Sequence, residues 1–401
     1  MTSRPKARIG LALAGGGAEG AIYEIGALRA LEEAVAGLDF TRLDVYVGVS
    51  AGAFVAACLA NRIPVSRLCR GLVSPEPGMH PIAPRILFTP AWREWVRSGG
   101  RLPRLAAEAV ADLARHPGDV SLLGALTRLA RALPVGLFDN EPFRAYLERT
   151  FNRPGRTDDF RRLSSKLVVV AADLDSGSAV RFGEPPFDTV PISRAVQAST
   201  ALPGLYPPAE IDGRCYVDGV LLKTLHASVA LEAKVDLLIG VNPIVPVDTA
   251  RAVERGVMRR GRLTDRGLPT VLSQTLRTLI HSRMTTGFAK YAALYPSTDV
   301  LLLEPRRDDY RMFFTNVFSL SARRATAEHA YEATRRTLRE RADEIAPRLA
   351  KLGLELRRDV LNDPDRDLWS GVGIHEEARS GVARKLHHLL DRLDAVLESA
   401  D

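Results

Sequence analysis

The sequence predicts an α/β fold: a three-layer sandwich in which helices cover both faces of a central, mostly parallel sheet. Short apolar segments alternate with helical patterns, the order typical of parallel strands joined by crossover helices. The first two apolar segments each run into a glycine-containing turn and then a helical pattern. Of the 401 residues, 46% are hydrophobic and 26% are charged, which is enough apolar surface for a large core.

The first 60 residues supply two strands and two helices of this fold. Residues 7–14 are an apolar run that ends at three glycines, as expected of a strand buried on both faces. From Ile22 to Val35, apolar residues recur every three or four positions, which indicates a helix. Residues 43–52 predict a second strand that enters a tight turn, and residues 53–60 a helix of small side chains.

The rest of the chain adds strands, an insertion and C-terminal helices. Four apolar segments predict strands over residues 166–174, 178–183, 235–243 and 298–305. The second of them is expected to form a hairpin with the first. A helical insertion is expected at about residues 75–150, with an aromatic cluster of Phe88, Trp92 and Trp95.

Residues 319–352 have the pattern of one long helix that Gly353 would end. A later apolar stripe is typical of a packed helix face and also of a homodimer seam; it comprises Val382, Leu386, Leu389, Leu393 and Val396. We therefore predict a main domain over residues 1–330 and a helical extension over residues 331–401.

The charge balance is basic and dominated by arginine. Lys and Arg number 55 against 48 Asp and Glu, a net charge of +7, and 48 of the 55 are Arg. Codon usage explains such a bias, and a phosphate-binding surface is the alternative. The stretch Arg251–Arg266 holds six Arg and two acidic residues, so it could lie on an anionic membrane or form a solvated helix face. It lacks the interleaved aromatics typical of nucleic-acid binding, so we expect no nucleic-acid partner.

Several classes of protein are not favoured. Three scattered cysteines, Cys58, Cys69 and Cys215, predict neither a disulfide framework nor a metal site, and we expect no metal or cofactor. No apolar run reaches the length of a membrane-spanning helix. The apolar run near the start is shorter than a signal-peptide core, so we expect a first strand and a cytoplasmic location.

Residues Gly48-Val49-Ser50-Ala51-Gly52 form a G-x-S-x-G pattern between a predicted strand and a predicted helix. In this context the pattern is typical of a nucleophile on a sharp turn, where only glycine fits beside the serine. The amides at the start of the following helix favour negative charge at the same place. We therefore predict that Ser50 is a nucleophile.

A serine needs a base, and the histidines offer none in a triad-like context. His226 alone lies near a predicted site residue. Asp218 follows a short strand at an Asp-Gly turn, and a buried carboxylate can accept a serine proton. Taken alone, Asp-Gly is simply a common turn dipeptide.

The glycine loop Gly15–Gly20 matches the G-x-G-x-x-G pattern of dinucleotide-binding proteins. That function needs a carboxylate at the end of the second strand, where this chain has Ser50 instead. The alternative is an oxyanion hole, since two adjacent parallel strands would bring the loop beside Ser50.

Four segments in order resemble the patatin-like phospholipases over roughly residues 7–330. They are the glycine loop, GVSAG with Ser50, residues 198–208 and VDGV with Asp218. The resemblance implies a catalytic domain with a Ser50–Asp218 dyad that works without histidine. It also implies an oxyanion hole formed by Gly15, Gly16 and Gly17, and hydrolysis of lipid esters, most readily phospholipids or lysophospholipids.

The chain departs from the family at Glu19, where a basic residue is usual. An arginine from elsewhere could supply that charge, and the sequence leaves open which one. Neutral-lipid or other ester hydrolysis on the same dyad, and a catalytically impaired lipid-binding protein, remain alternatives. The implied partners are a lipid substrate and an anionic membrane surface.

Overall fold

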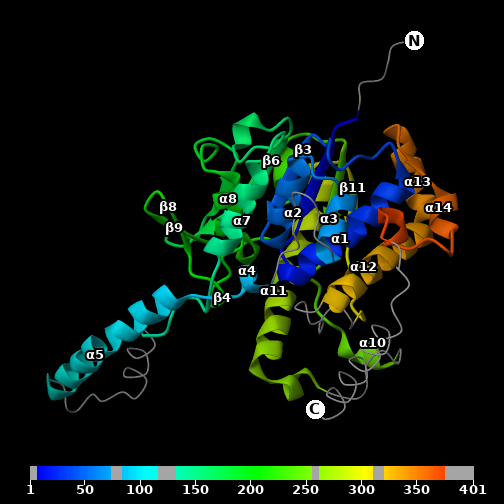
Figure 1. The fold of residues 1–401 in the computed structure, drawn as a ribbon. Coiled ribbons are helices and arrows are strands. Elements are labelled where there is room, and N and C mark those ends of the chain that lie inside the picture. Colours follow the sequence, from blue (N-terminus) through cyan, green and yellow to red (C-terminus); the bar gives the residue numbers. More distant parts are fainter. Residues whose placement is uncertain (1–6, 74–83, 116–131, 255–261, 310–319, 375–401) are drawn as a thin grey trace, which may run out of the picture.

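The computed structural model describes residues 7–73, 84–115, 132–254, 262–309 and 320–374. Its central sheet is built from β1 Ile9–Leu13, β3 Val45–Val49, β6 Lys166–Asp173, β7 Ala179–Phe182, β8 Ala209–Ile211, β9 Arg214–Asp218, β10 Leu237–Val241 and β11 Asp299–Leu303. The strand order is β11-β10-β1-β3-β6-β9-β8, and β7 also pairs with β6 (Figure 1).

Most of the sheet is parallel, as the sequence predicts. The strands from β11 to β6 run parallel to one another, whereas β7 and β9 are antiparallel to β6, and β8 is antiparallel to β9. The predicted hairpin between residues 166–174 and 178–183 is confirmed as β6 and β7. With the helices described next, the mostly parallel sheet confirms the predicted fold class.

Helices form a layer on each face of this sheet. One core is shared by α1 Gly17–Ala34, α2 Ala51–Ala60, α3 Val65–Val73, α7 Glu141–Phe151, α8 Ile192–Ser199 and α12 Leu320–Glu340. The other core is shared by α9 Ser228–Glu232 and α11 Gly267–Leu294. Side chains of β1 alternate between the two: Leu11 and Leu13 enter the first core, and Ala12 and Ala14 the second.

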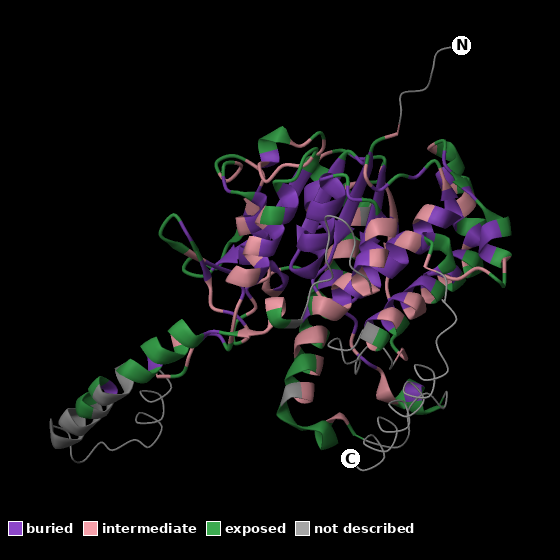
Figure 2. Ribbon diagram, viewed as in Figure 1, coloured by how far each residue is buried: buried purple, intermediate pink, exposed green. Residues whose placement is uncertain are grey.

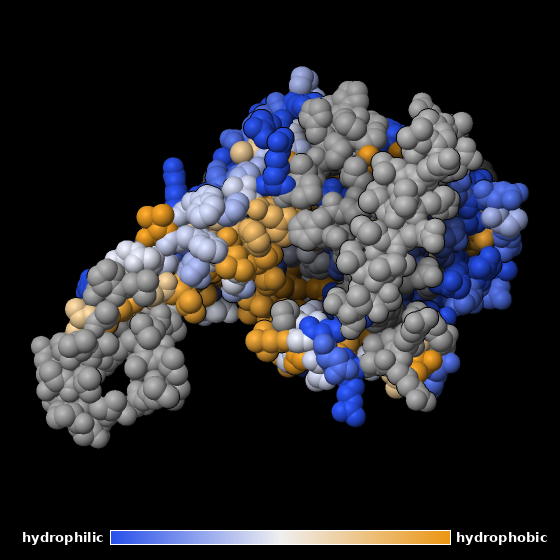
Figure 3. All heavy atoms as spheres, turned by 60° about the horizontal axis from the view of Figure 1, so that its bottom comes forward, coloured by the Kyte–Doolittle hydropathy of each residue, from blue (hydrophilic) through white to orange (hydrophobic). Residues whose placement is uncertain are grey.

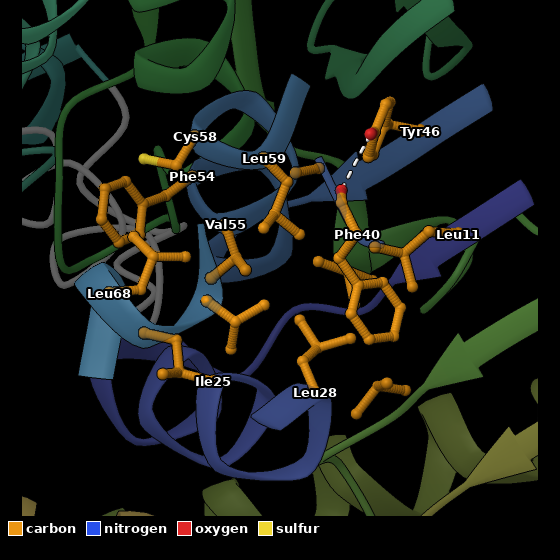
Figure 4. Packing of buried hydrophobic residues seen from close by; sticks show 14 of the residues in the cluster. Leu11, Ile25, Leu28, Phe40, Tyr46, Phe54, Val55, Cys58, Leu59 and Leu68 are labelled. Carbon is orange, nitrogen blue, oxygen red and sulfur yellow. Dashed lines mark hydrogen bonds between the residues drawn. The ribbon is translucent and has the colours of Figure 1, made fainter. Parts of the chain in front are cut away.

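The first core is densely filled where α1, α2 and α3 meet the sheet. Figure 4 shows Ile25 and Leu28 of α1 facing Val55 and Leu59 of α2. The Tyr46 hydroxyl donates a hydrogen bond of 2.8 Å to the carbonyl of Phe40, so this buried phenol is paired. Because this packing fixes α2 against β3, it also fixes the turn between them.

The predicted insertion contains α4 Pro84–Leu87 and α5 Trp92–Arg115, joined by β4 Thr89–Pro90, which pairs with β5 Phe138–Asp139. Figures 1 and 2 show α5 projecting from the body of the molecule with much of its surface exposed. Residues 74–83 and 116–131 of the insertion lie outside the described residues.

The prediction of one long helix over residues 319–352 is wrong. The chain forms α12 and then α13 Ala342–Lys351, because Arg341 leaves the helical conformation between them. This turn lets Ile345 and Leu349 of α13 pack into the same core as α12. Gly353 does end the pattern, at a φ of 75° that favours glycine.

The remaining described elements are short: β2 Val35–Ala36 pairs with β12 Glu355–Leu356, and α10 Thr249–Glu254 and α14 Arg358–Asn362 lie outside the sheet. The predicted C-terminal stripe from Val382 to Val396 falls outside the described residues, and so does part of the basic stretch, residues 255–261. Among the helices that the structure describes, none has the length and apolar character to cross a bilayer.

Candidate active site

Ser50 lies at the sharp turn between β3 and α2. Its φ of 54° and ψ of −123° form a conformation that non-glycine residues rarely adopt. The backbone N–H of Ser50 donates a 2.8 Å hydrogen bond to Ser199 Oγ, which in turn donates a 2.6 Å bond to the carbonyl of Val170. Ser199 on α8 therefore ties the strained turn to strand β6.

Two glycines make this turn possible. A Cβ added at Gly48 would lie 2.5 Å from Ala53 Cα, and one added at Gly52 would lie 2.5 Å from the carbonyl carbon of Leu13. The Gly52 N–H also donates a 3.0 Å hydrogen bond to the carbonyl of Ala14. The G-x-S-x-G spacing is thus a consequence of close backbone contact on both sides of Ser50.

Asp218 ends β9 and faces Ser50. The Ser50 side chain lies close enough to this carboxylate to act on the pKa of Asp218 and lower it, and Oδ1 accepts a hydrogen bond of 2.9 Å from the N–H of Val220. The carboxylate is almost fully buried, and this burial raises the pKa of Asp218 from 3.8 to about 7. A carboxylate with that pKa can take a proton near neutral pH.

The glycine loop joins β1 to α1 and lies beside Ser50, because β1 and β3 are neighbouring parallel strands. A Cβ added at Gly15 would lie 3.3 Å from the Cβ of Ser50 and 2.9 Å from a methyl group of Val220. Gly16 and Gly17 have positive φ values of 153° and 62°, which favour glycine. Both line the same cavity as Ser50 and Asp218.

This cavity has a volume of about 340 Å³, within the range of small-molecule sites. Away from Ser50 its walls are mostly apolar; they include Ile22, Ile25, Phe54, Leu68, Leu72, Phe88, Phe143, Leu202, Leu205, Leu276 and Ile280. The predicted aromatic cluster divides here: Phe88 lines the cavity, whereas Trp92 and Trp95 face solvent. The segment 198–208 contributes Thr200, Leu202, Leu205 and Tyr206.

A positive side chain reaches the glycine loop from a distant part of the chain. Arg277 of α11 lines the cavity, and Arg323 of α12 lines it as well. Burial lowers the pKa of the Arg277 guanidinium, while the nearby Glu19 carboxylate acts to raise it. Glu19 occupies the position where the resemblance predicts a basic residue, and Arg277 lies close to it.

His226 does not share the cavity of Ser50. It lines a second cavity, formed by residues 222–227 and the C-terminal half of α11. Burial lowers the pKa of His226 to about 4, so its imidazole is neutral at physiological pH. Among the described residues, no cluster of histidine, cysteine and carboxylate side chains is suited to hold a metal ion.

Sequence reasoning missed Ser199, Arg277 and Arg323. Ser199 lies at the start of the segment 198–208 that the resemblance identified. The segment could therefore be assigned to the site from the sequence, but the role of the Ser199 hydroxyl could not. Arg277 lies 227 positions after Ser50, on a helix whose pattern marked only a basic region. Arg323 resembles any surface arginine at the start of a helix, although only 7% of its surface is exposed.

The chain is similar to uncharacterized NTE family proteins of Mycobacterium bovis and Mycobacterium tuberculosis. Each is 38% identical over 75 residues, which is 19% of this chain and 19% of the relative. The match therefore spans about a fifth of the length of these curated relatives.

Two solved structures align over most of the chain at low similarity. VipD from Legionella pneumophila has a TM-score of 0.30 and 14% identity, over 99% of this chain and 88% of that one. ExoU from Pseudomonas aeruginosa, solved with SpcU, has a TM-score of 0.24 and 16% identity, over 96% and 74%.

A family model described as patatin-like phospholipase matches residues 11–231, more than half of the chain. The matched range contains the glycine loop, Ser50, Ser199 and Asp218, and ends before α11. The chain therefore belongs to the patatin-like phospholipase family.

Proposed function

We propose that this chain is a serine acyl hydrolase that cleaves carboxylic esters of phospholipids or lysophospholipids. The observation that carries the proposal is the placement of Ser50, on its strained turn, next to the buried carboxylate of Asp218 in the lining of one mostly apolar cavity. Family membership supports lipid hydrolase chemistry. The apolar walls suit an acyl chain, which gains free energy when it leaves water.

The reaction has two steps. Ser50 Oγ attacks the ester carbonyl as Asp218 takes its proton, and the amides of Gly15, Gly16 and Gly17 stabilise the oxyanion. The tetrahedral intermediate expels the alcohol, which takes the proton from Asp218, and an acyl-enzyme remains. Water then attacks the acyl group and gives a proton to Asp218, the fatty acid leaves, and the proton returns to Ser50 Oγ.

Two arginines at the cavity favour a phosphate-bearing ester over a neutral lipid. Arg277 and Arg323 line the cavity, and among the described lining residues Asp218 is the only acidic side chain. A guanidinium pairs with phosphate through two parallel hydrogen bonds. Arg277 also bears on the alternative of an impaired enzyme, because it brings a positive charge close to Glu19.

The test is a panel of lipid esters combined with a fluorophosphonate that labels activated serines. Labelling and hydrolysis are expected in the natural chain, and Ser50→Ala should lose at least about a thousandfold in kcat. A Ser50→Ala variant with the natural rate would overturn the proposal. A natural chain that binds lipid but neither reacts with the fluorophosphonate nor hydrolyses any ester would support the impaired alternative.

The same panel tests the substrate class. Arg277→Gln should lower kcat/KM for phospholipids by about tenfold or more and leave a neutral diacylglycerol less affected. Arg283→Gln is the matched control, because Arg283 lies on the same helix and lines the second cavity instead. Equal losses on phospholipid and diacylglycerol would contradict phosphate recognition by Arg277 and leave ester hydrolysis standing.

A further inference from the structure

Apolar side chains that face water border the cavity of Ser50. On α11, Leu268, Leu272 and Leu279 are 68%, 58% and 58% exposed. Exposed apolar residues at the base of α5 and just before β5 complete the group: Trp92, Trp95, Val96, Leu133, Val135 and Leu137. We call these nine residues the apolar rim. Figure 3 shows apolar side chains gathered in the centre of this face, between α5 and α11.

The rim continues the cavity wall along α11. Leu276 and Ile280 of this helix line the cavity. At 100° per residue, the three exposed leucines fall within about 40° of one another, on the part of the helix surface that adjoins Leu276 and Ile280. The N-terminal half of α11 therefore has apolar side chains both toward the cavity and toward solvent. Packing within the described residues does not explain the apolar side chains that face solvent.

The rim also joins the cavity wall at the base of α5. The Leu137 N–H donates a 3.1 Å hydrogen bond to the carbonyl of Leu205, whose side chain lines the cavity. Trp95 Nε1 donates a 3.3 Å bond to the carbonyl of Leu137, and the rings of Trp92 and Trp95 lie 6.0 Å apart. The rim thus meets the wall of the cavity at two places, along α11 and at the base of α5.

Basic side chains outnumber acidic ones beside the rim. Helix α11 carries no acidic residue; of its Arg and Lys residues, Arg277 lines the cavity, whereas Arg283 and Lys290 line the second cavity. Exposed arginines lie beside the rim at Arg93 and Arg97 on α5 and at Arg262 and Arg266 before α11. Two acidic residues lie among them, Glu94, which pairs with Arg97, and Asp265. A second copy of this chain would bring like charges together, whereas an anionic lipid surface complements both the charge and the apolar side chains.

We propose that the apolar rim docks this chain on an anionic lipid surface, with the cavity open toward the bilayer. The inference rests on the proposed function, because a lipid ester must reach Ser50 from a membrane or micelle. Exposed leucines on α11 enter the acyl region, and Trp92 and Trp95 take the interfacial position that indole rings prefer. The arginines around them contact the headgroups.

The test measures vesicle binding separately from catalysis. The full chain carrying Ser50→Ala is sedimented with vesicles of phosphatidylcholine and phosphatidylglycerol, and with vesicles of phosphatidylcholine alone. A triple variant, Leu268→Ser, Leu272→Ser and Leu279→Ser, removes the α11 part of the rim. Leu294→Ser is the matched control, since Leu294 is 67% exposed on the same helix but lines the second cavity.

We expect binding to the anionic vesicles that weakens with salt, a loss of at least about tenfold in affinity in the triple variant, and no loss in the control. With Ser50 restored, the triple variant should hydrolyse a water-soluble short-chain ester at the natural rate. Equal vesicle affinity of the natural and triple-variant chains would overturn the docking proposal, whatever the hydrolytic activity.

A rim that joins two copies would overturn it too, and light scattering would then report a dimer that the triple variant loses. Failure of the proposed function has a different signature. Ester hydrolysis would be absent while the natural chain still bound anionic vesicles through the rim.

Discussion

At the scale of single residues, the proposed mechanism and the burial of Asp218 together predict that both activity and stability depend on pH. The Ser50 side chain and the Val220 N–H, which donates a hydrogen bond to the carboxylate, both act to lower the pKa of Asp218, yet burial outweighs them and raises it from 3.8 to about 7. The charged form needed to accept the serine proton is therefore the form that folding disfavours. Under the proposed mechanism, the burial that makes Asp218 a stronger base also lowers the stability of the folded chain above the pKa of the unfolded carboxyl.

We expect kcat/KM for a soluble ester to fall about tenfold per pH unit below about pH 7, because protonated Asp218 cannot accept the Ser50 proton. A profile that stays flat down to about pH 5 would contradict this role.

The stability of the natural chain should fall as pH rises from about 4 to about 7, since the folded state holds this proton more tightly than the unfolded state. Asp218→Asn stays neutral, so it should be more stable than the natural chain near pH 8, by up to about 4 kcal/mol in thermal unfolding.

Ser199 offers a second test at this scale, because its hydroxyl holds the backbone of Ser50. Ser199→Ala should remove one hydrogen-bond partner each from the buried N–H of Ser50 and the buried carbonyl of Val170. We expect the unfolding free energy to fall by about 2 kcal/mol. We expect kcat to fall about tenfold or more as the Ser50 turn loses its anchor.

Ser193→Ala is the matched control for that variant. Ser193 is also fully buried on α8, and its hydroxyl donates to Asp158 rather than to the site. It should lose stability in the same denaturant titration and keep kcat. If both variants lost kcat equally, Ser199 would have only a structural role.

A sequence pattern can identify a site residue when that residue requires particular neighbours in the chain. Ser50 needs Gly48 and Gly52 within two positions, so the sequence marks it. Asp218 was marked weakly by its Asp-Gly turn and more strongly by its order among four segments. Arg277 lies on α11, far from Glu19 in the sequence, so no spacing of residues along the chain connects the two.

At the scale of elements, the turn between β3 and α2 is the most constrained connection near the site. Gly48→Ala places a methyl group 2.5 Å from Ala53 Cα, closer than real contacts allow, so strand and helix must separate. We expect a loss of about 2 kcal/mol or more in unfolding free energy and a loss of serine labelling.

Gly99→Ala provides the comparison for that variant. Gly99 lies within α5, and a Cβ added there has nothing within 4 Å. Since alanine is the better helix former, this variant should gain up to about 1 kcal/mol and keep full labelling. A Gly48→Ala variant as stable and as reactive as Gly99→Ala would contradict the close contact at the turn.

Apolar segments predict strands reliably here, and β1, β3 and β10 are buried along their whole length. The strands predicted from six apolar segments correspond to β1, β3, β6, β7, β10 and β11, and their ends differ from the observed ones by at most three residues. The pattern failed over residues 319–352, because α12 and α13 share one apolar face and Arg341 continues the helical spacing. A break that redirects a helix without a glycine or proline at the break leaves no local signal.

At the scale of the whole molecule, the C-terminal helices are part of the first core. Helix α12 packs closely along α1: a Cβ added at Gly26 would lie 2.3 Å from the carbonyl oxygen of Ala327. The buried carboxylate of Glu33 on α1 accepts a 2.6 Å bond from the Tyr331 hydroxyl and a 2.7 Å bond from Arg366 Nε. Such long-range packing could not be predicted from residues 17–34 alone.

The division into residues 1–330 and 331–401 stays a prediction, and its boundary falls inside α12. A chain ended after residue 330 would lose the buried side chains of Tyr331, Leu338, Leu368 and Trp369. At about 1.5–3 kcal/mol for each large apolar side chain, this loss is comparable with the whole stability of a typical domain. It would also leave Glu33 without Tyr331 and Arg366.

We therefore expect a chain ended after residue 330 to be largely unfolded by circular dichroism and inactive on a soluble ester. The matched control is a chain ended after residue 374, which keeps every element described beyond residue 320 and should unfold cooperatively near the natural melting temperature. If the shorter chain unfolded as cooperatively as the longer one, residues 1–330 would be an independent domain. Activity in the longer chain alone would instead make α12 and α13 part of the catalytic unit, although the matched family range ends at residue 231.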